Sequence, residues 1–345
     1  MIYPKHPEPP GELSHPRGGL IAALCLLLLA ANGSLGDAVV GGCSVADLRS
    51  ALAQGGTVTF TQDCAITFAG PIIVTNRVKL QGNGYSITLN GGGHSRLFIV
   101  EPGADFSLAA LTLTAGKAAA GAGLYIKAGG VVTASNCIFS AHQTAGTRGA
   151  DGPDGAGSTG IGESGGAGEA GAAARGGAVF NVGVFRAARS RFLTNSAIGG
   201  AGGQGGDGGA GLFGGGNGGA GGEGGAGVGG AIYNTGNLSL TDCAFEGNAA
   251  SGGDGGSGGV GGSGPAPGLK GVGGAGAVGY GAGVYSVNSA RIERCTFSAN
   301  VGAGGDSAAG GTLTGGNGSN GAAGAAAAGA GLWLAGPGAI TNCTV

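Results

Sequence analysis

Two short motifs recur along this chain at a fixed spacing, and the repeat constrains the fold more than any other feature. The first motif is glycine, two small residues, an apolar residue and an aromatic one; it spans Gly121–Tyr125, Gly176–Phe180, Gly229–Tyr233, Gly281–Tyr285 and Gly329–Trp333. The second motif, C-x-F-x-x-N, follows each copy, with phenylalanines about 53 residues apart at Phe139, Phe192, Phe245 and Phe297. A repeat of this length predicts a solenoid, in which each unit buries its apolar face against its neighbours.

Short strands with alternating side chains make up each unit. Leu238 and Leu240 are expected to face inward and Ser239 outward, because successive side chains of a strand point to opposite faces. Before residue 140 the period is shorter, since Leu113 and Phe139 occupy equivalent positions 26 residues apart. One coil therefore takes roughly 25 residues, and consecutive coils would lie about 4.8 Å apart, as neighbouring strands do in a sheet.

Stacked coils place equivalent residues above one another, so the repeat predicts ladders of like side chains. A core ladder is expected at Phe139, Phe192, Phe245 and Phe297, where each buried ring contributes about 1.5–3 kcal/mol. A second ladder, of small buried groups, is expected at Cys137, Ser190, Cys243, Cys295 and Cys343. These thiols suit a packed core as free cysteines, and a disulfide between Cys243 and Cys295 is the alternative.

Two further ladders are expected at turns. Asn195, Asn248 and Asn300 would satisfy backbone groups at one corner; a row of ligand-binding amides is the alternative. The residues three places before each phenylalanine, and their counterpart in the last repeat, alternate in sign and predict a surface charge ladder: Asn136, Arg189, Asp242, Arg294 and Asn342. Exposed pairs of this kind contribute about 0–1 kcal/mol each. Contact with a polysaccharide is the rival interpretation of this row.

The two motifs together resemble the repeat of chlamydial polymorphic outer-membrane proteins and related bacterial surface proteins. Those proteins in turn resemble the right-handed parallel β-helix, or pectin-lyase-like, superfamily. Residues 87–116 are also similar to the opening coils of such domains, and the resemblance covers residues 43–345. It implies an all-β, right-handed parallel β-helix over residues 57–345 and no particular activity. One departure is His142, which stands where the motif has asparagine.

Glycine makes up 89 of the 345 residues, and it is concentrated in four inserts that follow the second motif. The inserts cover about 143–174, 196–228, 249–280 and 301–328. Glycine at every third place is typical of packed polyproline-II helices, so each insert is expected to be an outgoing arm, a turn and a returning arm reaching roughly 40 Å. Four inserts leaving one corner would form a two-layer fin. Disordered low-complexity loops are the alternative.

The N-terminus has the pattern of an export signal. Leu20–Ala31 is an unbroken apolar run of 12 residues, whereas a membrane-spanning helix needs about 20. Small residues follow the run, which predicts a signal peptide over residues 1–38. No transmembrane helix is then expected in the mature chain, and the remaining cysteines would reach an oxidising compartment.

A short segment after the signal is expected to cap the solenoid. Ser44 begins a capping box within a helix-forming segment at 39–56, and the first strands start at Thr57. A helix there would cover the open edge of the sheets. Cys43 and Cys64 flank the helix and the first strand, so they are the expected disulfide; two free core thiols are the alternative.

Residues that could carry chemistry are scattered. Gly202–Asp207 matches the start of a calcium-binding nonapeptide repeat, but no nine-residue period follows, so calcium is a weak expectation and no cofactor is expected. An acidic-polysaccharide lyase would need a carboxylate cluster and a basic residue on one strand face, and the available groups are Arg186, Arg291, Asp105, Glu101 and His94. The carboxylates lie in separate segments, and the sequence holds no evident nucleophile–base pair, so no catalytic or metal residue is assigned. The net charge of −2 argues against nucleic acid as a partner.

The sequence therefore predicts a secreted or cell-surface protein, at the outer membrane or outside the cell, with a structural or adhesive role and no catalysis. Its partners would be carbohydrate or the surface of a host or neighbouring cell. A polysaccharide lyase or glycoside hydrolase is the first alternative, and an ice- or surface-binding polyglycine protein is the second. The last repeat stops at Cys343–Val345, before its phenylalanine. This predicts a longer parent chain, or self-association through the uncapped coil.

Overall fold

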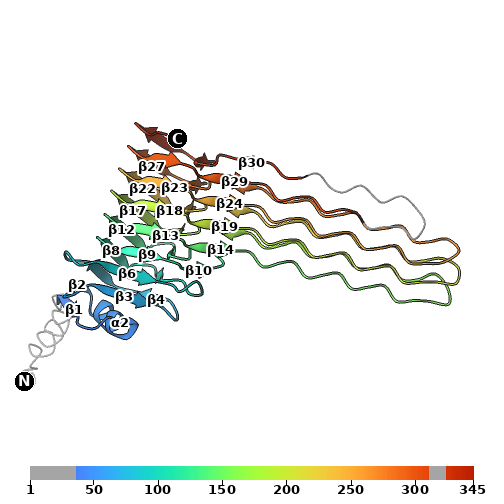
Figure 1. Cartoon of the computed structure of the whole chain (residues 1–345), viewed down its shortest axis with the longest axis horizontal. Helices are drawn as coiled ribbons and strands as arrows, with labels where there is room; N and C mark the ends of the chain where they lie inside the picture. Colours follow the sequence, from blue (N-terminus) through green and yellow to red (C-terminus); the bar gives the residue numbers. More distant parts are fainter. Residues whose placement is uncertain (1–35, 311–323) are drawn as a thin grey trace, which may run out of the picture.

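The computed structural model describes residues 36–310 and 324–345. Three long sheets of parallel strands form the body of the molecule (Figure 1). The first sheet contains, in spatial order, β1 (Ala38–Val40), β2 (Gly56–Phe60), β5 (Arg77–Gln81), β8 (Asp105–Ala109), β12 (Val131–Ser135), β17 (Val184–Ala188), β22 (Asn237–Thr241), β27 (Ala290–Glu293) and β32 (Gly338–Thr341). The second contains β3 (Cys64–Thr67), β6 (Ile87–Asn90), β9 (Thr112–Thr114), β13 (Ile138–Ser140), β18 (Arg191–Leu193), β23 (Ala244–Glu246) and β28 (Thr296–Ser298). The third contains β4 (Ile72–Val74), β7 (Phe98–Val100), β11 (Leu124–Ile126), β16 (Val179–Asn181), β21 (Ile232–Asn234), β26 (Val284–Ser286) and β31 (Leu332–Leu334).

Two shorter sheets lie where the glycine-rich inserts leave and rejoin the body. The fourth sheet contains β10 (Lys117–Ala118), β14 (Gln143–Ala145), β19 (Ser196–Ile198), β24 (Ala249–Ser251) and β29 (Val301–Ala303). The fifth contains β15 (Ala174–Arg175), β20 (Gly227–Val228), β25 (Gly279–Tyr280) and β30 (Ala327–Ala328). The chain visits the sheets in the same order in every repeat, which gives a solenoid-like stack of coils. The prediction of an all-β fold with parallel sheets is confirmed.

The register of the strands follows the sequence repeat. Phe139 pairs with Leu113 on one side and with Phe192 on the other, so each repeat lies directly on the previous one. Phe139 and Phe192 are fully buried, and their rings stack with centroids 4.9 Å apart. Phe245 and Phe297 continue the row at 4.6 and 4.8 Å. The phenylalanines therefore form a continuous stack through the core.

The helix α2 (Val45–Gln54) lies beside the first strands of the stack, near the N-terminal end in Figure 1. Ser44 is its N-cap and accepts the Asp47 amide hydrogen bond at 3.1 Å, while Asp47 places a negative charge in the first turn. The helix buries Leu48, Ala51 and Leu52 in the core shared with the first strands. In the described part of the chain it is the one helix.

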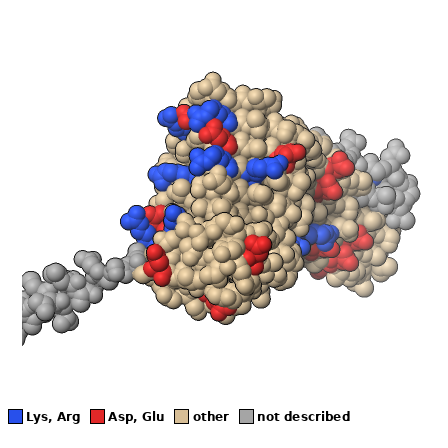
Figure 2. Space-filling model, turned by 60° about the vertical axis from the view of Figure 1, so that its left-hand side comes forward, with Lys and Arg blue, Asp and Glu red and all other residues tan. Residues whose placement is uncertain are grey.

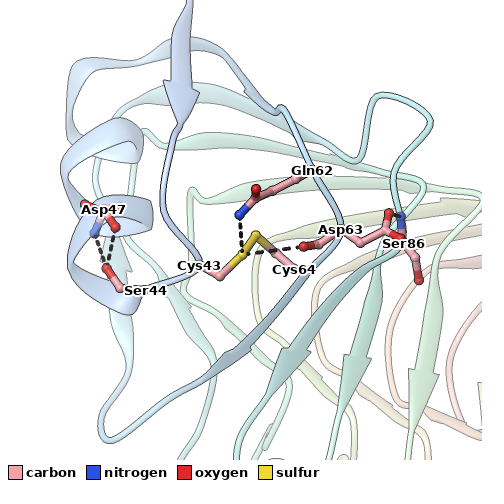
Figure 3. Close-up of a disulfide and its surroundings, with 7 residues drawn as sticks. All are labelled: Cys43, Ser44, Asp47, Gln62, Asp63, Cys64 and Ser86. Atoms are coloured by element: carbon pink, nitrogen blue, oxygen red, sulfur yellow. Dashed lines mark hydrogen bonds between the residues drawn. A yellow bond between two sulfur atoms is a disulfide. The ribbon is translucent and has the colours of Figure 1, made fainter.

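A disulfide joins Cys43, just before α2, to Cys64 at the start of β3 (Figure 3). Their Cα atoms are 5.3 Å apart, and 21 residues separate them in the sequence. Gln62 donates its side-chain amide to the Cys43 sulfur, and Asp63 accepts the Ser86 backbone N–H at 2.8 Å. The bond thus fixes the helix to the first coil.

The predicted signal peptide falls on residues 1–38, of which the structure describes only 36–38. Ala38 already belongs to β1 and pairs with Val58. The apolar run Leu20–Ala31 and Cys25 lie outside the described residues. No helix in the described part of the chain is long and apolar enough to cross a membrane.

Candidate functional site

The glycine-rich inserts project from one corner of the stack as long extended arms that run side by side (Figure 1). We call this projection the fin. Its outgoing arms cover residues 146–157, 199–210, 252–263 and, as far as described, 304–310. Its return arms cover 162–173, 215–226, 267–278 and, as far as described, 324–326.

Hydrogen bonds join the arms in a pattern that repeats every third residue. Where the next arm of the same layer is described, the first residue of each triplet donates its N–H to that arm, as Gly149 does to Ala201 at 2.9 Å. In every described arm except the first outgoing one, the second residue donates to the other layer, as Gly219 does to Gly206 at 2.8 Å. The outgoing arms thus form one layer and the return arms another. This bonding is that of packed extended helices with three residues per turn.

Close packing explains why the inner arms use two glycines per triplet. A Cβ atom at Gly205 would overlap the Gly219 carbonyl oxygen of the other layer, and one at Gly206 would overlap the Pro153 carbonyl oxygen of the adjacent arm. The third residue of each triplet points out of the fin and carries the side chain. Only the absence of a Cβ allows the backbones to approach this closely.

The outgoing layer presents an acidic face. Its third positions include the five aspartates Asp151, Asp154, Asp207, Asp254 and Asp306. Four of them also accept a backbone N–H from the next arm, as Asp151 does from Gln204 at 2.7 Å and Asp207 from Val260 at 2.7 Å. The repeating backbone hydrogen bonds between the arms leave these third-position N–H groups without an acceptor, and the carboxylates supply it. Arg148 pairs with Asp151 and, mainly through this hydrogen bond, lowers the pKa of that carboxyl.

The return layer presents a largely apolar face, which we call the return face. It consists of the third-position residues Ser164, Ala167, Ala170, Ala173, Asn217, Ala220, Glu223, Ala226, Leu269, Val272, Ala275 and Val278. Leu269 and Val272 are 69% and 57% exposed. At the tip of the fin, Ile161, Leu212 and Phe213 are also exposed. The fin therefore has two broad faces of different chemistry.

A row of aromatic side chains runs along the outer surface of the third sheet, beside the fin. Phe180 and Tyr233 stack at 5.2 Å, Tyr233 and Tyr285 at 5.3 Å, and Tyr280 of the fifth sheet stacks on Trp333 at 4.8 Å. In the sequence these residues are recognisable only as the ends of the repeat motif. The alternation rule could have placed them outward, because the residue before each ring faces the core.

Two arginines lie over this aromatic row. The Arg96 guanidinium carbon is 5.1 Å from the centroid of Tyr125, and that of Arg175 is 5.8 Å from the centroid of Tyr233. Arg96 also donates to the Gly121 carbonyl, which anchors it to the turn before β11. Burial, followed by the neighbouring phenols Tyr233 and Tyr280, raises the pKa of Tyr285. The row therefore combines ring edges, phenol groups and cations on one strip of surface.

The charge ladder lies at the turn between the first and second sheets. Asn136, Arg189, Asp242, Arg294 and Asn342 all have positive φ angles of 48–54°, a conformation that most side chains avoid. Arg294 binds Asp242 at 2.7 Å and lowers the pKa of that carboxyl, while Arg189 donates to Asn136 at 3.1 Å. Figure 2 shows basic and acidic side chains side by side on one face of the body. The left-handed backbone was not anticipated, because arginine rarely marks such a turn.

The asparagine ladder is buried at Asn195 and Asn248 and partly buried at Asn300, and its side-chain amides are hydrogen-bonded within the corner. Asn248 accepts hydrogen bonds from the backbone and side-chain amides of Asn195, and donates its own side-chain amide to Phe192 and Asn300. Asn195 and Asn248 are fully buried. These contacts leave the amides directed at their neighbours rather than at a ligand.

His142 begins the same ladder and is fully buried. Its Nδ1 atom accepts the Gly116 N–H at 2.9 Å, while Nε2 has no hydrogen-bond partner among the described residues. Burial lowers the pKa of His142 to about 3, and the Leu113 carbonyl opposes this shift only in part. The imidazole is therefore neutral over the physiological range.

The thiol ladder also lies in the core. Cys137, Cys243 and Cys295 are buried and free, and Cys343 is free and partly buried. Burial raises the pKa of Cys137 to about 11. A hydrogen bond to Cys243, together with burial, raises the pKa of Cys295, and the Cys343 sulfur accepts the Cys295 N–H at 3.3 Å. Ser190 occupies the second step and donates its hydroxyl to Ala188.

The groups considered for a lyase do not converge. Glu101 pairs with Lys127 at 2.7 Å, Asp105 with Arg77 at 3.6 Å, and Arg291 with Glu293. His94 contacts the Gly92 carbonyl of its own turn. Arg186, on β17, is in register with Ser239 rather than with a carboxylate. Each carboxylate is thus already held by a local cation.

No cluster of three or more His, Cys, Asp or Glu side chains suited to a metal occurs among residues 36–310 and 324–345. Asp207, the acidic residue of the calcium-like hexapeptide, is engaged with the Val260 N–H. A shallow surface hollow of about 260 Å³ lies over the first sheet, lined by Thr57, Arg77, Lys79 and Asp105 among others. It is remote in sequence from the repeats and the fin.

Comparison of the chain with known protein families, with curated proteins and with solved structures found no match. The fin with its two faces and the aromatic row beside it therefore stand as the candidate functional surfaces on geometry alone.

Proposed function

We propose that this chain is a secreted or cell-surface protein with a structural or adhesive role and no catalysis. In this proposal the solenoid is a right-handed parallel β-helix of the pectin-lyase-like type, and α2 caps its first coil. Leu48 and Leu52 support the cap, because the helix buries them against strands whose edge would otherwise meet solvent. The Cys43–Cys64 disulfide supports export to an oxidising space.

The fin is the observation that carries the functional proposal. It extends roughly 40 Å from the body, its arms are joined by regularly spaced backbone hydrogen bonds, and its side chains are on the two faces and the edges. A large, regular and rigid surface suits binding to an extended partner. Several charged groups of the body, in contrast, are engaged in local pairs such as Arg294–Asp242.

Carbohydrate on a cell or matrix surface is the proposed partner, and the aromatic row is the proposed contact. Tyr233, Tyr285 and Arg175 present phenol groups, ring edges and a guanidinium at one strip. Hydroxyl-rich polymers can accept and donate hydrogen bonds with such groups. Because the row repeats once per coil, it offers the same contact several times to a repeating polymer.

The test is retention on a polysaccharide surface. Beads coated with the purified protein are passed over pectin, alginate and chitin films, and the force needed to detach them is measured. We expect retention on at least one film, with a loss of several-fold when Tyr233 and Tyr285 are both replaced by Ser. Replacement of Thr133 and Ser239 by Ala, on the first sheet, is the matched control.

The same incubations test the alternatives. Unsaturated or reducing ends in the supernatant would favour a polysaccharide lyase or hydrolase and overturn the proposal. Absence of retention on every film and on cells would also overturn the adhesive role. Thermal hysteresis of the purified protein would instead favour the ice-binding alternative.

A further inference from the structure

The return face of the fin is an exposed apolar surface that nothing in the described chain covers. Nine of its twelve side chains are Ala, Val or Leu, and Glu223 is its one charged member. Leu269 and Val272 expose more than half of their surface. Packing between the arms does not require these side chains to be apolar, because third-position side chains point away from the neighbouring arms. Contiguous apolar patches of this kind mark interaction sites.

The two faces of the fin restrict which partner fits. The outgoing face carries Asp151, Asp154, Asp207, Asp254 and Asp306, so two outgoing faces would repel each other. An outgoing face against a return face would strip water from carboxylates without supplying cations. Two return faces, however, would bury apolar groups on both sides. Of the three ways in which the fins of two copies could face each other, contact between the two return faces is the one that the side chains favour.

The rows of the return face are also graded in size. The row from the first insert is small, with Ala167, Ala170 and Ala173, whereas the row from the third insert is bulky, with Leu269 and Val272. A second copy, turned about a two-fold axis along the arms, would place the bulky row over the partner's small row and the middle row over its own counterpart, with the Glu223 carboxylates side by side near the base of the fins. Because both copies have the same spacing between arms and the same three-residue repeat, the rows stay matched along their length.

The available area is sufficient for a dimer. Three return arms of about 40 Å in length, spaced by about 4.8 Å, give a face of about 600 Å². Two such faces bury about 1,200 Å², at the lower end of the range for stable protein interfaces. The Ala and Val side chains lose little conformational freedom on contact, which favours association through this face.

We propose that two copies of this chain associate through their return faces, so that the fins form a four-layer structure that projects from two solenoids lying at the same end of the fins. This inference goes beyond the proposed function, because the dimer would form whether or not the protein is displayed on a surface or binds carbohydrate. It also differs from association through the ends of the solenoid, since the fin projects from the side of the stack (Figure 1).

A matched pair of valines tests the proposal. Val272 and Val260 both occupy third positions in the third insert, and both accept an N–H through their carbonyls, from Gly221 and Gly208. Val272 lies on the return face and Val260 on the outgoing face. We expect the wild type and Val260→Lys to sediment as dimers at micromolar concentrations in the full chain. We expect Val272→Lys to sediment as a monomer, with the dimer dissociation constant raised at least a hundredfold. Circular dichroism and thermal unfolding check that the variants fold alike.

Several outcomes would overturn the proposal. They are a monomeric wild type at high micromolar concentration, a dimer that survives Val272→Lys, and equal loss of the dimer in both variants. Ala220→Glu, in the middle row, provides a second return-face variant in case Val272→Lys does not fold. A monomeric wild type that instead co-sediments with phosphatidylcholine vesicles would assign the face to lipid. Bead retention is measured separately, so failure of the adhesive role leaves the sedimentation result intact.

Discussion

His142 offers the sharpest test of the physical reasoning, because its burial makes stability depend on pH. The neutral imidazole accepts from Gly116 through Nδ1, so its proton is on Nε2, where no partner is available among the described residues. Its pKa is about 3 in the folded protein, against about 6.5 in an unfolded chain. At a pH between these two pKa values, the imidazole is protonated in the unfolded chain and neutral in the folded protein. Stability from this group is therefore complete above pH 6.5 and is lost as the pH falls toward 3.

The change to test is His142→Asn, which restores the residue that the repeat uses elsewhere. Leu113 is in register with Phe139, so its carbonyl lies where an asparagine side-chain amide can donate, as Asn195 does to Phe139 at 3.0 Å. At pH about 7.5 we expect a change in unfolding free energy within about 1 kcal/mol, because relief of the unpaired Nε2–H offsets the smaller volume. At pH about 4.5 the wild type loses about 3 kcal/mol through His142, and the variant does not.

Urea unfolding of both proteins at several pH values measures this difference. The volume change does not depend on pH, and other titrating groups are common to both proteins, so the difference in slope isolates the imidazole. It should approach 1.36 kcal/mol per pH unit below pH about 6. Parallel curves, or an NMR titration that places the pKa of His142 near 6.5, would refute the argument from burial.

Three other predictions concern the fin, the asparagine ladder and the disulfide. Gly219→Ala should destabilise the fin by about 1–3 kcal/mol, because the added Cβ would overlap the Gly166 carbonyl oxygen. Hydrogen exchange of the arms measures this loss. Gly157→Ala, at a position where a Cβ fits, is the control. Asn248→Ala should lower the free energy of unfolding in urea by about 3 kcal/mol or more, since it leaves several buried amides and carbonyls unpaired. A decrease below about 1 kcal/mol would contradict the assigned hydrogen bonds. Replacement of both Cys43 and Cys64 by Ser should cost about 3 kcal/mol, as expected for a loop of this length, and reducing agent should lower the wild-type midpoint but not that of the variant.

The body of the fold could be predicted because its signals are local and repeated. Phe139 and Phe192 occupy the same place in the motif, and a parallel stack with one register brings them to 4.9 Å without any further information. The same logic placed the start of the first strands at Thr57, within one residue of the Gly56 at which β2 begins. Register is strongly specified when one face of every strand is buried.

The surface could not be predicted to the same depth, because it depends on which arms and coils become neighbours. Asp207 reads in the sequence as a solvated carboxylate or a calcium ligand, yet it accepts the Val260 N–H from the next arm. Arg189 and Arg294 adopt left-handed backbone that no local preference of arginine indicates. In both cases the neighbouring coil, 52 or 53 residues away in sequence, supplies the stabilising contact.

The position of an arm within the fin, however, can be deduced from the glycine pattern of its triplets. The arms of the second insert have glycine at both inner positions of each triplet, as at Gly205 and Gly206, because each arm has neighbours in its own layer and in the other. The outgoing arm of the first insert has Thr147, Ala150, Pro153 and Ala156 at the second position, because no earlier arm lies there. The number of glycines per triplet therefore reports whether an arm is inside the fin or at its edge. A disordered linker would not need one glycine per triplet in the first outgoing arm and two in the arms of the second insert. This difference in glycine content therefore favours an ordered fin that begins at the first insert.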